Sequence, residues 1–184
     1  MPIAASMRTN VAQLYVALFG RAPDVDGMGY WVTRLGNGES LASVAQAMFD
    51  TAPARTYYPL FLTNQEIIGK FYSNVLGRTA DSDGLAFWTA KLNQPGATPG
   101  AVMAQMIDVV ANYKGTDAAG VKSAALFNNK ATVALDYAVN VQGGAAGSAA
   151  AIAGVTDDAA TVTAKIAANN TPAPVAGQTF TLTT

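Results

Sequence analysis

Cysteine and histidine are absent from the sequence, and only 12% of its 184 residues are charged. The lack of cysteine excludes disulfide bonds and thiol nucleophiles, and the lack of histidine excludes Ser-His-Asp triads and the common kinds of zinc site. The formal net charge is −1, and no two basic residues are adjacent in the chain. Because binding to phosphates requires clustered Lys and Arg, we expect no nucleic-acid partner.

Long apolar runs are also missing, although 51% of the residues are hydrophobic. No stretch reaches the roughly 18 uncharged apolar residues of a membrane span, so we expect no transmembrane segment. The apolar run after Arg8 is similar to part of a secretory signal, but it contains Gln13 and recurs later in the chain. We therefore assign that run to the fold and expect no cleavable signal peptide.

The first two thirds of the chain contain an internal repeat at an offset of 57 residues. Residues 11–35 read VAQLYVALFGRAPDVDGMGYWVTRL, and residues 68–92 read IGKFYSNVLGRTADSDGLAFWTAKL. A related segment follows each copy, SLASVAQAMFD at 40–50 and TPGAVMAQMID at 98–108. The identical pairs are Tyr15 and Tyr72, Gly20 and Gly77, Arg21 and Arg78, Asp24 and Asp81, Asp26 and Asp83, Gly27 and Gly84, Trp31 and Trp88, and Leu35 and Leu92.

Apolar residues recur in each copy at the three- and four-residue spacing of one helix face. This spacing predicts three short helices per unit and an all-α fold. Asn10 is the predicted cap of the first helix, and Thr63 with Glu66 forms the pattern of a capping box. Ser40 and Thr98 are the predicted caps of the third helix in each unit.

The tandem repeat occupies residues 1–114 and is predicted to form one body. Its units span about 10–50 and 67–110, and we expect them to pack together through residues 51–66. This connecting segment contains the apolar cluster Tyr-Tyr-Pro-Leu-Phe-Leu, which is too hydrophobic for a solvated linker.

Alanine, glycine and threonine dominate the last third of the chain. Residues 115–170 are predicted to be an alanine-rich helical extension, in which 143–154 is either a flexible joint or a loosely packed helix. Residues 171–184 are predicted to be a linker. Because residues 178–184 alternate polar and apolar as a strand does, we expect a β-rich region to follow.

The most specific shared pattern is G-R-x-x-D-x-D-G, at 20–27 and again at 77–84. A structural interpretation accounts for every position, because glycine can end one helix, the aspartates favour the start of the next, and arginine can pair with a carboxylate. A calcium interpretation rests on D-x-D-G alone, without the other ligands of an EF-hand loop. A third interpretation is contact of the arginines with an anionic partner. The residues concerned are Arg21, Arg78, Asp24, Asp26, Asp81 and Asp83.

Catalytic patterns are lacking: the sequence has no G-x-S-x-G, Walker or dinucleotide-binding motif, and its acidic pairs all fall at predicted helix starts. We therefore expect a protein that is not an enzyme. Trp31 and Trp88 lie on the predicted apolar faces and are expected to be core residues. Tyr30 and Phe87 lie one position off those faces and are the better candidates for an exposed platform that contacts a glycan or a partner.

The pattern Y-x-x-L-F-G-R-A-P-D-x-D-G-x-x-Y-W at 15–31, with its partner at 72–88, resembles a helical family of unknown function. That family occurs in secreted RTX-type proteins and is related to the linker domain of phycobilisomes. The double copy, with N-K-A-T-V-A-L-D-Y-A-V at 129–139 and the Ala/Thr-rich tail, is similar to the N-terminal region of bacterial surface-layer (S-layer) proteins exported by type I secretion.

The resemblance implies a secreted protein at the cell surface, whose helical N-terminal domain attaches a lattice to outer-membrane lipopolysaccharide. It also favours calcium binding downstream over calcium binding within this chain, since the glycine-aspartate repeats are missing here, and we predict no cofactor for this chain. The leading hypothesis is a non-catalytic anchoring or assembly domain that binds lipopolysaccharide, another surface polysaccharide or neighbouring copies. The alternative is a protein–protein linker, scaffold or adhesin module without glycan contact.

Overall fold

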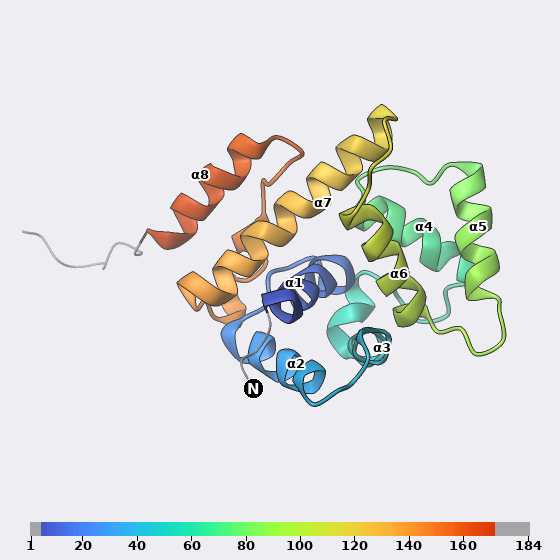
Figure 1. Ribbon diagram of the computed structural model, residues 1–184, viewed down its shortest axis with the longest axis horizontal. Coiled ribbons are helices and arrows are strands. Elements are labelled where there is room, and N and C mark those ends of the chain that lie inside the picture. The colour runs from blue at the N-terminus through green and yellow to red at the C-terminus, as the bar shows by residue number, and fades with distance from the viewer. Residues whose placement is uncertain (1–4, 172–184) are drawn as a thin grey trace, which may run out of the picture.

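The computed structural model describes residues 5–171, which form α-helices joined by short turns, as Figure 1 shows. The all-α prediction is confirmed, and the predicted strand at 178–184 lies outside the described residues. No helix within 5–171 combines the length and the apolarity that crossing a bilayer requires. The helices are α1 (Ala5–Phe19), α2 (Val25–Gly36), α3 (Leu41–Phe49), α4 (Asn64–Val75), α5 (Ser82–Leu92), α6 (Pro99–Ala111), α7 (Ala118–Asp136) and α8 (Ala159–Asn170).

The predicted three helices per unit are confirmed, with α1–α3 in the first unit and α4–α6 in the second. The capping box of Thr63 and Glu66 is present, and the Ser40 side chain accepts from the Ser43 backbone N–H. One predicted cap is wrong, and another lies at the predicted N-cap position without a side-chain hydrogen bond. Asn10 lies inside α1, because the apolar face continues back to Met7, which packs against the core. Thr98 precedes α6, but its side chain makes no capping hydrogen bond.

Helix α1 lies at the centre of the molecule and is covered from several sides. Every residue from Val11 to Phe19 except Gln13 is buried. The helix packs against α2 of its own unit and against α7 of the extension, which runs beside it in Figure 1. A helix enclosed in this way is apolar nearly all round, and its burial stabilises both the repeat and the extension.

The two units meet mainly where α3 packs against α6. The backbones approach closely at Gly100, where an added Cβ would collide with the main chain at Ala45 and Gln46. The Gly100 backbone N–H also donates to Gln46 Oε1, 2.8 Å away. The units therefore form one body, joined at a contact that only a residue without a side chain allows.

The connecting segment only partly packs between the units. Tyr58 is fully buried, and its hydroxyl donates to the Ala17 carbonyl at 3.0 Å. However, Leu60 and Phe61 project into solvent, and the Phe61 side chain is 99% exposed. The expectation that the whole aromatic cluster is packed is wrong at these two residues, because Phe61 has φ of 69° and turns the chain outward.

The extension is folded against the repeat and shares its hydrophobic core, through residues such as Phe127 and Ile152. Helix α7 runs unbroken through Asn128 and Asn129, whose side chains donate to the carbonyls of Ala111 and Thr156. A π-helical turn (Tyr137–Val141) ends it, and residues 143–152 form short 3₁₀ turns with a fully buried Ser148. The 143–154 stretch is thus neither a free joint nor a long helix.

Candidate functional site

The repeated arginine turns join α1 to α2 and α4 to α5. Gly20 and Gly77 end the first helix of each unit in the left-handed region, with φ of 61° and 67°, as predicted. Arg21 Nη1 lies 3.4 Å from Asp24 Oδ2, and Arg78 Nη1 lies 3.1 Å from Asp81 Oδ2. Both arginines therefore pair with the carboxylate that follows them in the turn.

A tyrosine lies beneath each arginine. The guanidinium of Arg21 is 5.4 Å from the ring centre of Tyr15, and that of Arg78 is 5.0 Å from the ring centre of Tyr72. Burial, and to a smaller extent the nearby aspartate, raises the pKa of both phenols, so they remain neutral. These rings act as stacking surfaces for the arginines and as part of the core, and not as acids or bases.

The candidate calcium ligands are used within the turns. Asp24 and Asp81 accept from the backbone N–H of Gly27 and Gly84, in both cases at 2.8 Å. The pKa of the Asp81 carboxyl is lowered, mainly by the hydrogen bond from the Gly84 N–H and to a smaller extent by the hydrogen bond from Arg78. In the described part of the chain, no three acidic side chains gather in a group that could hold a metal ion.

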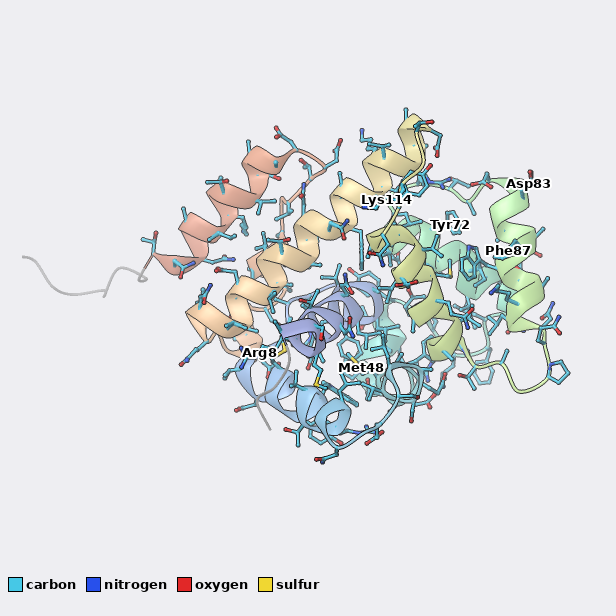
Figure 2. The ribbon with its side chains drawn as sticks, viewed as in Figure 1. Arg8, Met48, Tyr72, Asp83, Phe87 and Lys114 are labelled. Atoms are coloured by element: carbon cyan, nitrogen blue, oxygen red, sulfur yellow. The ribbon has the colours of Figure 1, made fainter. Side chains whose placement is uncertain are left out.

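Asp26 and Asp83 lie in the first turns of α2 and α5, and Figure 2 labels Asp83 there. A carboxylate in this position stabilises the positive end of the helix dipole. Asp24 and Asp81 therefore have partners within their own turns, and Asp26 and Asp83 lie where the helix dipole favours a carboxylate.

The two turns differ in what covers them. In the first unit, Arg21 Nη1 donates to Ser148 Oγ at 2.9 Å, a contact across 127 residues of sequence. The Ala22 backbone N–H donates to the Ser148 carbonyl at 2.9 Å. Asp24 is accordingly only 17% exposed, whereas Asp81 in the second unit is 56% exposed.

Ser148→Ala is expected to lower the free energy of unfolding by about 1–3 kcal/mol, because it removes the buried acceptor of the Arg21 guanidinium. Urea unfolding followed by circular dichroism measures the change. Ser73→Ala on the exposed face of α4 is the matched control and should change stability by less than about 0.5 kcal/mol. Equal stability of the two variants would contradict the role given to Ser148.

The candidate platform residues are exposed, as their positions predict. Tyr30 is 58% and Phe87 55% exposed, while the neighbouring Trp31 and Trp88 are each 8% exposed. Each exposed ring meets its tryptophan edge to face, with centroids 4.8 Å apart in α2 and 5.1 Å apart in α5. The pairs are thus held in a defined orientation by the core.

A cation one turn further along each helix completes the platform. Arg34 is 5.1 Å from the Trp31 ring centre, and Lys91 Nζ is 5.3 Å from the Phe87 ring centre. Arg34 is held by both carboxylate oxygens of Glu39 at 2.7 and 2.6 Å, which lowers the pKa of Glu39. In the first platform, formed by Tyr30, Trp31 and Arg34, the positive charge of Arg34 is therefore neutralised by Glu39.

The second platform keeps its positive charge and borders a groove of about 770 Å³ between α5, α6 and the start of α3. Within residues 5–171, Lys91 Nζ donates only to the neutral amide of Gln105, at 3.0 Å. Figure 2 shows Phe87 on α5 near α6, and Asp108 adds a carboxylate to the same groove. An aromatic face, an ammonium, an amide and a carboxylate thus converge on one open, largely apolar surface.

Sequence reasoning found Phe87 but missed Lys91, Gln105 and Asp108. Lys91 could have been found, since it follows Phe87 by four residues and lies on the same helix face. Gln105 and Asp108 come from α6, and only the packing of α6 against α5 brings them to the groove.

Comparison with family models agrees with the repeat. The model described as a domain of unknown function, DUF4214, matches residues 4–58 and again residues 54–108. The chain belongs to the DUF4214 family. Each DUF4214 match covers one three-helix unit, and the second also covers much of the connecting segment. No curated protein and no solved structure matches the chain significantly.

Proposed function

We propose that this chain is a non-catalytic anchoring and assembly module of a secreted surface-layer or RTX-like protein, and that it binds lipopolysaccharide or another surface glycan. The groove beside Phe87 carries this proposal. Sugar rings present apolar C–H faces that pack on an exposed aromatic ring, and their hydroxyls need nearby donors and acceptors. Lys91, Gln105 and Asp108 supply these groups beside the ring.

The family resemblance supports the same setting. Double copies of this module resemble the N-terminal regions of S-layer proteins, which hold a lattice to the outer membrane. The absence of cysteine is compatible with export, because a protein without thiols does not depend on the redox state of its compartment.

The purified chain should bind lipopolysaccharide-bearing cells that have been stripped of their own surface layer, and it should fail to bind cells that lack O-polysaccharide. Phe87→Ala is expected to weaken retention about tenfold, because it removes the stacking surface of the groove. Tyr30→Ala is the matched control, since its platform is neutralised by Glu39 and does not line the groove. Retention can be measured by co-sedimentation with the cells.

Two results would refute glycan anchoring at this groove. One is equal retention on both kinds of cell, and the other is full retention of a folded Phe87→Ala protein.

The second candidate function is a protein–protein scaffold, and the tip formed by Leu60 and Phe61 favours it. A phenylalanine that is 99% exposed in a left-handed conformation has an unfavourable solvent contact and backbone strain. Insertion of the Phe61 side chain into an apolar pocket of a partner protein would remove the ring from water and offset the backbone strain.

Phe61→Ser is expected to reduce self-association, as measured by sedimentation velocity over a range of concentrations. Val121→Ser changes another exposed apolar residue, 49% exposed on α7, and should leave association unchanged. If the parent chain is monomeric throughout the range, or if Phe61→Ser associates equally, assembly through this tip is excluded.

A further inference from the structure

The first unit of the repeat holds a segment of its own chain in its arginine turn. Three donors of the turn contact residues 143–148: Arg21 Nη1 reaches Ser148 Oγ at 2.9 Å, the Ala22 N–H reaches the Ser148 carbonyl at 2.9 Å, and the Val25 N–H reaches the Gly143 carbonyl at 3.1 Å. The segment reads Gly-Gly-Ala-Ala-Gly-Ser. Its small side chains allow a close approach, which leaves Ala22 fully buried.

The second unit presents the same donors without such a segment. Arg78, Thr79 and Ser82 stand at the positions of Arg21, Ala22 and Val25. Arg78 Nη1 reaches Asp81 and the Thr79 carbonyl, both within its own turn. Among residues 5–171, the backbone N–H groups of Thr79 and Ser82 have no acceptor. Thr79 and Ser82 are exposed, in contrast to the buried Ala22.

Two further observations point to an occupant. Arg78 Nε is buried and has no hydrogen-bond partner within the described residues. A depression of about 190 Å³ lies beside it, lined by Tyr72, Arg78 and Trp88 together with residues of α6 and α7. The turn thus has an unsatisfied donor next to a space that a ligand can enter.

We propose that residues 77–82 of the second unit are a docking site for a polypeptide turn of small residues that contains a serine, the kind of segment that residues 143–148 supply to the first unit. Two of the three acceptors in the first unit are main-chain carbonyls, so the matching ligand is a peptide and not a sugar. The proposal is independent of glycan binding, because the groove beside Phe87 does not include Arg78.

The test is a titration of the full chain, labelled with ¹⁵N, with the peptide GGAAGSAA, which has the sequence of residues 143–150. We expect saturable shifts of the Thr79 and Ser82 amides and of the Arg78 Nε–H signal, with no shifts at Ala22 and Val25. In the first unit the segment is tethered, and tethering supplies an effective concentration in the millimolar range. The free peptide lacks this effective concentration, so the titration should extend to peptide concentrations on the order of millimolar.

Two arginine substitutions and one altered peptide sharpen the test. Arg78→Lys keeps the charge but removes the forked donor, and it should weaken binding about tenfold. Arg34→Lys changes an arginine that is engaged by Glu39 and should have no effect. The peptide GGAAGAAA, which lacks the serine, should bind more weakly than GGAAGSAA.

Three results would overturn the proposal. These are no saturable shift at Thr79 and Ser82, equal binding by Arg78→Lys, and shifts at this turn with lipopolysaccharide O-chains but not with the peptide. The last result would assign the turn to a sugar. None of these results bears on the cell-retention experiment, whose readout is Phe87.

Discussion

Trp31→Ala is expected to lower the free energy of unfolding by about 3–5 kcal/mol, which is the usual cost of removing a buried indole. Trp31 is 8% exposed, and it supports the ring of Tyr30 and the guanidinium of Arg34 on the outer side of α2. Neighbouring side chains cannot fill so large a space without moving whole helices. A loss of this size shifts the urea midpoint by about 2 M for a slope of about 2 kcal/mol/M.

Tyr30→Ala provides the control at the adjacent position, because the tyrosine ring is 58% exposed. It should cost no more than about 1 kcal/mol, mainly through the lost edge-to-face contact with Trp31. A Trp31→Ala protein as stable as the parent would show that the indole is not part of the core. If that stable protein had also lost cell binding, the contact would lie at Trp31 in the first unit and not in the groove beside Phe87.

Gly100→Ala is expected to destabilise the chain by about 3 kcal/mol, because the added methyl group collides with the main chain at Ala45 and Gln46. A flexible side chain could move away, but the backbone of α3 cannot do so without separating from α6. The substitution should also break the hydrogen bond from the Gly100 N–H to Gln46 Oε1. Thermal and urea unfolding both measure the loss.

Gly69→Ala is the matched control, since Gly69 lies inside α4 and an added Cβ there meets no atom within 4 Å. It should stabilise the chain by about 0.5–1 kcal/mol through a better helix propensity. The two glycine substitutions are thus expected to act in opposite directions. Tolerance of Gly100→Ala would mean that the units are not packed along α3 and α6 as described.

The repeat and its helices were predictable because their signals are local. Spacing along the chain sets the buried face of each helix, so Trp31 and Trp88 were expected to be core, and Tyr30 and Phe87 exposed. Capping by Thr63 with Glu66 depends on residues only three positions apart. The prediction that Asn10 caps the first helix is wrong, because the apolar face of α1 begins before Asn10 and the residue lies inside the helix.

Contacts between distant residues were not predictable in the same way. The outward turn at Phe61 is a backbone conformation that bulky residues rarely adopt, and its apolar neighbours suggested burial instead. The groove beside Phe87 likewise depends on Gln105 and Asp108, which only the position of α6 brings next to α5.

The sequence by itself determined that the chain is helical, duplicated and poor in reactive side chains. Composition can be counted directly, and helix periodicity and capping depend on residues that are close together in the chain. Only the tertiary structure decided how the two copies differ. The same arginine turn is covered by residues 143–148 in the first unit, whereas in the second unit α7 contacts only the start of the turn and Asp81 is 56% exposed, although the motif is shared. The physical reason is that a turn's sequence sets its own geometry, whereas its solvent exposure depends on a segment more than a hundred residues away.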